Sequence, residues 1–487
     1  MSQDFPEIDL AQVKLDPAWA LRVPPQLALR RLVLPVCLVE DALVTAFANP
    51  DDAPTREAVE QACGKTVAPM KADAAALRKM LLRVYGDQRS AATSPRDTDD
   101  PVSVAESILR AAAIRQASDI HLDPQRDGIR VRFRVDGVLE TFTQLPLSIQ
   151  AGLGSRVKVL AGLDIAERRA PQDGGFTWHM PGAEQRTPTD IRVATLPVRF
   201  GEKMTLRLLD AGRDGLTINS LGLEPAMLRQ FEQILDRPHG LVLLTGPTGS
   251  GKTTTLYAAI RFLLARTDLN ILTVEDPVEY EIAGVSQVEV DSGDKVNFAK
   301  ALRSLLRHDP DVVMIGEIRD EESLATAVKA ALTGHLVLST LHTNDAIGAV
   351  TRLLDMGLAP HLIAATLRLS ASQRLVRRLC VHCARPLTLT AEHALALECP
   401  ELEGRGAFQP GGCLRCAGRG YSGRIGVFEF MIPDTEVASM IAADTPATEV
   451  TAYLRQRKMP TLMDDAVQKV LAGKVTAGEV VQALCES

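Results

Sequence analysis

The residues with the clearest chemical potential form one glycine-rich segment. It has the spacing G-x-x-x-x-G-K-[ST], follows the apolar stretch Leu241–Leu244 and opens a helical pattern. Its members are Gly246, Pro247, Thr248, Gly249, Ser250, Gly251, Lys252, Thr253 and Thr254. Glycines let backbone N–H groups wrap a phosphate, and the N-terminus of the next helix adds positive potential. The segment predicts a phosphate-binding loop (P-loop); a chance glycine-rich turn is the alternative.

Two side chains of this loop have separate expected roles. Lys252 supplies a point charge for the β and γ phosphates, and the Thr253 hydroxyl is placed to ligate Mg²⁺. The predicted ligands are therefore a nucleoside triphosphate and Mg²⁺.

Nucleotide hydrolysis also needs a carboxylate near the metal and one that orients the attacking water. A short apolar stretch ends just before each of Glu317 and Glu275. In a parallel sheet both acids emerge at the carboxyl ends of the strands, where the loop also lies. We predict catalytic roles for both. Ordinary surface acids at strand ends are the alternative, and Asp276 and Glu279 are weaker candidates.

Two histidines flank one predicted strand. His335 opens it and His342 closes it. A lone histidine is more often structural, but beside a nucleotide site either one is a candidate sensor of the γ-phosphate.

Four arginines have both a plain and a functional interpretation. Arg303 and Arg307 stand at i and i+4 of a predicted helix and share a face, which indicates a solvated basic surface. Arg192 and Arg207 lie on predicted strands of the preceding domain. They pair with acids across strands, or they reach the nucleotide of a neighbouring subunit as arginine fingers.

Four of the eight cysteines form two close pairs, Cys380/Cys383 and Cys413/Cys416. Two C-x-x-C pairs can make a closed tetrahedral S₄ site, which is typical of structural Zn²⁺. A redox dithiol is the alternative, but two equal pairs argue against it. We assign this site to structure and docking rather than catalysis.

The bulk composition excludes several classes of protein. The chain has 487 residues, a net charge of −7 and 4% aromatic residues, so no global attraction to nucleic acid or anionic lipid is expected. The longest apolar run, residues 32–39, contains Pro35 and is far too short to span a membrane, and no export signal is visible. We expect a cytoplasmic protein without direct membrane insertion.

Alternating strand and helix patterns predict an α/β fold with a mostly parallel sheet, divided into about three or four domains. The expected parts are an α/β docking domain (1–86), a linker (87–101), a second α/β domain (102–215), the ATPase domain (216–379), a tetracysteine domain (380–428) and a helical C-terminal part (429–487). Asp136-Gly137 predicts a hairpin turn, and Gln172–Gly175 predicts another turn. We expect pivoting at residues 87–101 and at a short link near 213–215.

Several segments together resemble the type II secretion and type IV pilus assembly ATPases. The segments at 246–257, 271–280, 305–320 and 333–346 resemble the Walker A motif, Asp box, Walker B motif and His box of that family. SDIHLDP at 118–124 and RVRFRVDGVL at 130–139 resemble its second N-terminal domain, which is PAS-like. The tetracysteine insert followed by GYSGRIGVFE at 420–429 is similar to the assembly branch, since retraction ATPases typically lack the insert.

The resemblance implies a RecA-like ATPase domain in a homohexameric ring. It also implies that Lys252 and Thr253 bind nucleotide and Mg²⁺ and that Glu317 and Glu275 are catalytic acids. His335 and His342 become His-box residues, Arg192 and Arg207 inter-subunit arginines, and Arg303 and Arg307 ATPase-domain arginines.

The implied partners are an inner-membrane platform protein and a membrane-anchored docking protein, which would hold the motor peripherally at the inner membrane. The implied work is pseudopilus assembly in type II secretion, or alternatively extension of a type IV pilus. Two further alternatives are a DNA-translocating ATPase and a module that only senses nucleotide. Residues 7–86 resemble the later half of the family's first N-terminal domain, without its customary opening segment, and we expect no cyclic di-GMP ligand there.

Overall fold

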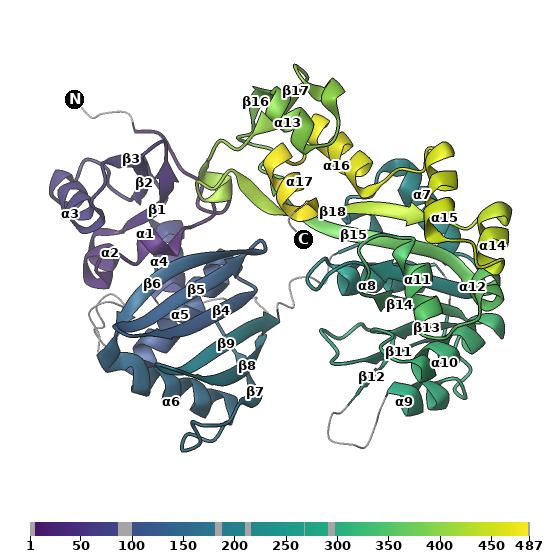
Figure 1. Cartoon of the computed structure of the whole chain (residues 1–487). Coiled ribbons are helices and arrows are strands. Elements are labelled where there is room, and N and C mark those ends of the chain that lie inside the picture. Colours follow the sequence, from purple (N-terminus) through teal and green to yellow (C-terminus); the bar gives the residue numbers. More distant parts are fainter. Residues whose placement is uncertain are drawn as a thin grey trace. The chain divides into compact units, whose positions relative to one another are not determined.

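The computed structural model describes residues 5–85, 100–180, 188–209, 216–266, 268–290 and 298–485 (Figure 1). The chain divides into two compact units. Unit 1 contains residues 1–213, 379–385 and 409–423, and unit 2 contains residues 214–378, 386–408 and 424–487. The link near 213–215 and nearly all of the predicted linker 87–101 lie outside the described residues. The domain boundaries drawn from the sequence stay predictions, and the α/β fold class is confirmed.

Unit 1 begins with a small α/β part around a three-stranded sheet of order β1-β2-β3. Glu40 and Asp41, both with positive φ, join β1 to β2 in the tight hairpin that such a pair favours. The elements are α1 (Pro17–Ala20), α2 (Pro25–Arg31), β1 (Val33–Val39), β2 (Ala42–Phe47), α3 (Ala53–Cys63), β3 (Val67–Lys71) and α4 (Ala74–Tyr85).

The second part of unit 1 is a six-stranded antiparallel sheet of order β6-β5-β4-β9-β8-β7, packed against two helices. Its hairpin at Asp136-Gly137 has positive φ at both residues, as predicted. The elements are α5 (Pro101–Arg115), β4 (Asp119–Gln125), β5 (Gly128–Val135), β6 (Val138–Pro146), α6 (Gln150–Ala161), β7 (Gln172–Trp178), β8 (Thr189–Val198) and β9 (Gly201–Leu209).

The turn predicted at Gln172–Gly175 is wrong, because these residues open strand β7. Their glycines serve close packing instead. A Cβ atom at Gly174 would lie 2.5 Å from the carbonyl oxygen of Ala161, and one at Gly175 would lie 3.0 Å from that of Ile191. Two adjacent glycines can therefore mark a crowded strand as well as a turn.

Unit 2 is built on a seven-stranded sheet of order β12-β11-β13-β14-β10-β15-β18. The registers show parallel pairing from β12 through to β15. The strands are β10 (Gly240–Thr245), β11 (Ile271–Glu275), β12 (Ser286–Glu289), β13 (Val312–Ile315), β14 (Leu336–Leu341), β15 (Leu367–Leu379) and β18 (Tyr421–Met431). The predicted central strands are confirmed, whereas β12, β15 and β18 were not foreseen.

Helices cover both faces of this sheet, which is why its central strands are apolar throughout. Alternate residues of β10 pack on opposite sides: Leu241 and Leu243 join the core under α9–α12, α14 and α15, and Val242 and Leu244 join the core under α7 and α8. The helices are α7 (Pro225–Leu235), α8 (Lys252–Leu264), α9 (Phe298–Leu305), α10 (Glu321–Leu332), α11 (Gly348–Asp355), α12 (Pro360–Thr366), α14 (Thr435–Ala442) and α15 (Ala447–Gln456).

A smaller core lies beside the sheet. It combines the two-stranded sheet of β16 (Arg385–Thr388) and β17 (Gly406–Gln409) with α13 (Ala391–Ala396), α16 (Leu462–Leu471) and α17 (Ala477–Leu484). The predicted helical C-terminal part is thus α14 to α17, which follow the end of β18.

Candidate functional site

The glycine-rich loop connects β10 to α8 at the carboxyl edge of the sheet in unit 2. Gly246, Gly249 and Gly251 have φ values of 141°, 81° and 90°, which other residues adopt only under strain. At Gly246 a Cβ atom would also lie 2.5 Å from the backbone oxygen of Gln373. The glycines therefore shape this tight loop.

Lys252 is the first residue of α8 and is 8% exposed. Its ammonium donates to the backbone oxygens of Gly246 and Pro247, at 2.6 and 3.1 Å. Burial, with a smaller contribution from the neighbouring Arg374 guanidinium, lowers the pKa of Lys252 to about 8. Among the described residues the ammonium is thus satisfied only by loop carbonyls, and an anion bound at the loop would stabilise its charge.

Two other features of the loop suit a phosphate. The Ser250 hydroxyl is buried and has no hydrogen-bond partner among the described residues. Within the same described part of the chain, no side chain caps the first N–H groups of α8. Uncapped N–H groups at a helix N-terminus bind anions readily, so the loop fits the predicted phosphate site. The Thr253 side chain is exposed at this end of the helix, where it can face a metal.

Glu317 lies at the same edge of the sheet, two residues after β13. One carboxylate oxygen lies 3.3 Å from Nε2 of His342, and the other contacts the Arg319 guanidinium. Arg319 also pairs with Asp276 at 3.1 Å. Burial lowers the pKa of His342, and the positive charges of Lys252 and Arg319 add to the effect. The fold therefore brings Glu317, His342 and Lys252 together at the carboxyl edge.

Glu275 has a different environment. It is 2% exposed, and its carboxylate accepts hydrogen bonds from Thr273 at 2.6 Å and Gln287 at 3.0 Å. The Tyr257 hydroxyl, on α8, donates to the second oxygen. Three neutral donors thus hold the side chain in the interior and tie it to the helix that follows the loop. The catalytic role expected for Glu275 stays a prediction.

His335 lies at the other edge of the sheet. It precedes β14, whose residue Leu336 pairs with Gly240 at the start of β10, whereas the loop follows Thr245 at the end of β10. Five residue steps of strand separate these edges by about 16 Å. The ring bonds the backbone oxygen of Ala330 at 3.0 Å. Sensing of the nucleotide of its own chain by His335 is therefore contradicted, and His342 occupies the position that suits this role.

Arg303 and Arg307 do not share a helical face as predicted, because α9 ends at Leu305. Arg303 pairs with Glu322 of α10 at 2.9 Å. The Arg307 guanidinium folds back onto the backbone oxygen of Arg303 at 3.0 Å. Neighbouring residues of this segment contact Asn270, which precedes β11, so the segment ends at the amino edge of the sheet.

Arg192 and Arg207 belong to unit 1. They are direct partners in the β8–β9 register, so both side chains lie on one face of that sheet. Arg207 is 61% exposed, and its Nε donates to Asp119 at 3.0 Å. The cross-strand pairing expected for Arg207 is therefore present, and its role at a neighbour's nucleotide stays a prediction.

The four paired cysteines converge in unit 1. Their sulfurs all lie within 4.8 Å of one another, and three of the pairs are separated by 3.8 Å. A tetrahedral ion with metal–sulfur bonds of about 2.3 Å requires sulfurs about 3.8 Å apart, so the geometry fits a metal site. The cysteines are Cys380, Cys383, Cys413 and Cys416.

Backbone amides donate hydrogen bonds to two of these thiols. Gly412 donates to Cys383 and Gly420 donates to Cys416, each at 3.2 Å. Burial raises the pKa of Cys416, but backbone N–H groups and neighbouring thiols outweigh it, so that the net pKa is lowered. Leu414 and Ala417, between and beside the ligands, pack against the core of residues 5–85. The metal site therefore supports a packing surface, and no substrate position is implied.

Two polar residues near the loop were missed by the sequence reading. Arg374 of β15 is 7% exposed and lies close enough to lower the pKa of Lys252. Glu429 of β18 is 8% exposed, and burial raises its pKa. Arg374 stands alone in its strand, and Glu429 ends the segment 420–429 without a spacing that points to a nucleotide site. Only the strand order β10-β15-β18 could have located them.

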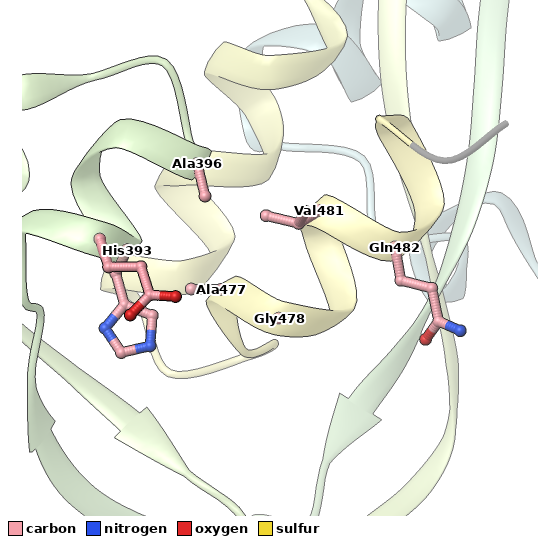
Figure 2. Close-up of a pocket in the computed structure, with 7 residues that line it drawn as sticks. His393, Ala396, Ala477, Gly478, Val481 and Gln482 are labelled. Carbon is pink, nitrogen blue, oxygen red and sulfur yellow. The ribbon is translucent and has the colours of Figure 1, made fainter.

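A hollow of about 440 Å³ lies between α13 and α17 (Figure 2). Glu392, His393 and Gln482 are its polar lining residues, and small residues of α17 complete the wall. It shares no residue with the glycine-rich loop or with Glu317, so the chemistry of the site does not depend on it.

Comparison with known proteins gives a consistent result. Residues 96–482 match the family described as Type II/IV secretion system protein, and residues 3–91 match the MshEN domain. The chain is 43% identical to the type II secretion system protein E of Klebsiella pneumoniae, over 84% of this chain and 83% of that protein. It is 38% identical to the type IV pilus assembly ATPase PilB of Thermus thermophilus, over 98% of this chain but only 56% of that protein.

Among solved structures, the Legionella pneumophila ATPase DotB aligns with a TM-score of 0.58 at 24% identity. The alignment covers 81% of this chain and 97% of DotB, and it shows a shared fold. The family resemblance carried by the sequence motifs is thereby confirmed. Within the described ranges, no helix has the length and apolar character needed to cross a membrane.

Proposed function

Because the chain belongs to the type II/IV secretion system protein family, we propose that it is an Mg²⁺-dependent ATPase that powers pseudopilus assembly in type II protein secretion. The observation that carries the proposal is the meeting of Lys252, His342 and Glu317 at one edge of the sheet, next to an uncapped helix N-terminus. A cation, a carboxylate and free N–H groups at such an edge are what phosphoryl transfer requires.

In the proposed mechanism, the glycine-rich loop binds the triphosphate through its backbone N–H groups. The Lys252 ammonium exchanges the carbonyls of Gly246 and Pro247 for phosphate oxygens. Bound Mg²⁺, held by Thr253, would neutralise charge on the β and γ phosphates. Glu317 orients the attacking water, and His342, hydrogen-bonded to Glu317, responds to the γ-phosphate.

Arginines supply the remaining positive charge. Arg319 pairs with both Glu317 and Asp276, and it can release either acid when the nucleotide arrives. We propose that Arg192 and Arg207 act on the nucleotide of a neighbouring subunit in a homohexamer, which gives developing phosphoryl charge an external partner. Arg303 and Arg307, at the amino edge, would then serve contacts between subunits rather than their own loop.

The proposed cellular setting follows the family. The motor would be cytoplasmic and would attach to the inner membrane through a platform protein and a membrane-anchored docking protein. The tetracysteine site would hold Zn²⁺ and stabilise the surface that packs against residues 5–85. Extension of a type IV pilus is the second candidate, favoured by the match to a pilus assembly ATPase over 98% of this chain.

The decisive test measures Mg²⁺-dependent ATP hydrolysis by the full chain and by Lys252→Ala. We expect hydrolysis only in the parent protein, and parent-like hydrolysis in the variant would contradict the assignment. Stimulation by DNA would instead favour a DNA translocase, which the net charge of −7 disfavours. Stimulation by the platform protein of one machine and not of the other would separate type II secretion from pilus assembly.

A further inference from the structure

The segment that follows β14, residues 342–346, is held by several polar contacts; we call it the His342 loop. Its backbone oxygen at Asn344 accepts from Ser372 and Arg374, both at 3.1 Å. Its backbone oxygen at Ala346 accepts from Ser370 at 2.6 Å. All three donors come from β15, so the loop that carries His342 is fixed to the strand next to the glycine-rich loop.

A further contact is made by Glu429 of β18. One oxygen of this buried carboxylate accepts from the backbone N–H of Ala346 at 3.0 Å. The other accepts from the backbone N–H of Leu462, the first residue of α16, at 3.3 Å. A single side chain thus joins the His342 loop to the N-terminus of a C-terminal helix. The Asp345 carboxylate of the loop repels Glu429, and the Arg374 guanidinium attracts it.

We propose that Glu429 is a positioning residue that couples the His342 loop to α16, so that a nucleotide bound at the glycine-rich loop changes the C-terminal helices. The inference rests on the proposed function, because it takes His342 as the group that responds to the γ-phosphate. A displacement of Ala346 must lengthen or shift a bond to a buried carboxylate, and Leu462 holds that carboxylate from the other side.

The competing explanation is that Glu429 has a purely structural role. The contacts of a second buried acid distinguish this explanation from the coupling. Asp465 of α16 accepts from the backbone N–H of Phe428 at 2.8 Å and pairs with Lys469, which is fully buried. This contact holds α16 on β18 without touching the His342 loop. Loss of the bond between Glu429 and Leu462 should therefore leave the helix in place and remove only the coupling.

Leu462→Pro removes the backbone donor together with the leucine side chain, which packs against the smaller core of unit 2. Proline is favoured at the first position of a helix, where its missing N–H and fixed φ are tolerated. The preceding Thr461 has φ −83° and ψ 170°, which suits a residue before proline. Leu462→Ala is the matched control, since it loses the same side chain but keeps the N–H.

Both variants are compared with the full-length parent in its assembled, Mg²⁺-loaded form. We expect Leu462→Pro to lower kcat for ATP roughly fivefold, the effect of about one hydrogen bond, with the Kd of ADP unchanged within about twofold. Leu462→Ala should keep the kcat of the parent. Equal kcat values in the two variants would overturn the coupling.

Hydrogen exchange gives an independent readout. In the parent, replacing ADP by a non-hydrolysable ATP analogue should change exchange in residues 342–346 and 462–465. In Glu429→Gln, whose amide can accept only one of the two bonds, the change should persist in the loop and disappear in the helix. No change in the parent loop would sink the nucleotide-site proposal itself. A loop response without a helix response in the parent would sink the coupling alone.

Discussion

The tetracysteine site and the glycine-rich loop are both built from short motifs, yet they differ in how ready each is to bind its ligand. Three of the sulfur–sulfur distances already have the tetrahedral value, all four sulfurs lie within 4.8 Å of one another, and backbone N–H groups of Gly412 and Gly420 support them. At the loop, the charged groups are instead occupied by partners within the chain: Lys252 bonds loop carbonyls, and Arg319 bonds Glu317 and Asp276. The first site needs only an ion, whereas the second must exchange partners to work.

This difference separates the proposed structural site from the proposed catalytic one. Four identical ligands in a closed arrangement leave no open position, so binding there contributes stability. At the loop, the buried ammonium has a lowered pKa, and an arginine holds the acid. A bound substrate can replace both interactions with its own. Substitutions at the loop should therefore change turnover, and substitutions at the cysteines should change metal content.

The largest effect is expected for Lys252→Ala. Removal of the ammonium from a desolvated phosphate site should lower ATP hydrolysis about 10³-fold, as loss of one preorganised charge typically does. The metal content of the purified protein should not change. Steady-state phosphate release and elemental analysis measure both quantities.

The control for that variant is Lys329→Ala, an exposed lysine in the last turn of α10, at the opposite edge of the same sheet. It should keep parent-like hydrolysis. If both lysine variants lost activity equally, net charge rather than position would be responsible, and the contrast between the two sites would fail.

Glu317→Gln should have the next largest effect. The amide keeps the shape of the side chain but cannot polarise water, so hydrolysis should fall about 10²-fold. Nucleotide binding should persist, because Lys252 and the loop N–H groups are intact. Single-turnover hydrolysis and ADP binding are measured together, with Glu321→Gln in the first turn of α10 as the control. A matching loss of binding would instead mean that Glu317 mainly shapes the site.

The pH dependence of nucleotide binding is a smaller and more specific test. Only protonated Lys252 attracts phosphate, and its pKa in the free protein is about 8. Bound phosphate raises that pKa, so binding above pH 8 must take up a proton. The Kd of ADP should rise about tenfold between pH 7.5 and 9. The lowered pKa of His342 keeps this group neutral throughout the window.

Lys252→Arg separates this titration from other pH effects, because the guanidinium stays protonated at pH 9. Its binding should be weaker at pH 7.5 but nearly independent of pH. Isothermal titration at several pH values measures the slope in both proteins. A slope shared by the parent and the variant would show that another group titrates.

The comparison also explains what the sequence can predict. The glycine-rich loop and the cysteine pairs depend on residues close together in the chain, and their spacing indicates the ligand directly. The central strands were predicted for the same reason, since a buried parallel strand has a continuous apolar run. The remaining features depend on which segments pair in three dimensions. Local sequence patterns do not carry that information.

Three particular errors illustrate this. His335 was grouped with His342, although the two ends of a strand must lie at opposite edges of the sheet. Gln172–Gly175 was read as a turn because glycine has two uses, and close packing against Ala161 is the other. Glu429 was overlooked because its partners, Ala346 and Leu462, are backbone groups from distant segments.

The smallest effect on turnover is expected at the metal site. Cys413→Ser should lower the metal content from about one zinc ion per chain to nearly none, because serine is a poor zinc ligand and a three-sulfur site is incomplete. The loss should destabilise unit 1, where Leu414 and Ala417 pack against the N-terminal core. Hydrolysis should fall less than about threefold if the site has no catalytic part. Elemental analysis, thermal unfolding and phosphate release measure the three effects.

Cys399→Ser is the matched control, because Cys399 is a half-buried thiol that lies between the two pairs in sequence but outside the cluster. It should retain the metal and the thermal stability of the parent. A 10²-fold loss of hydrolysis in Cys413→Ser, with the fold intact, would give the metal site a part in turnover. In that case the division between a closed structural site and an adaptable catalytic site would have to be abandoned for this chain.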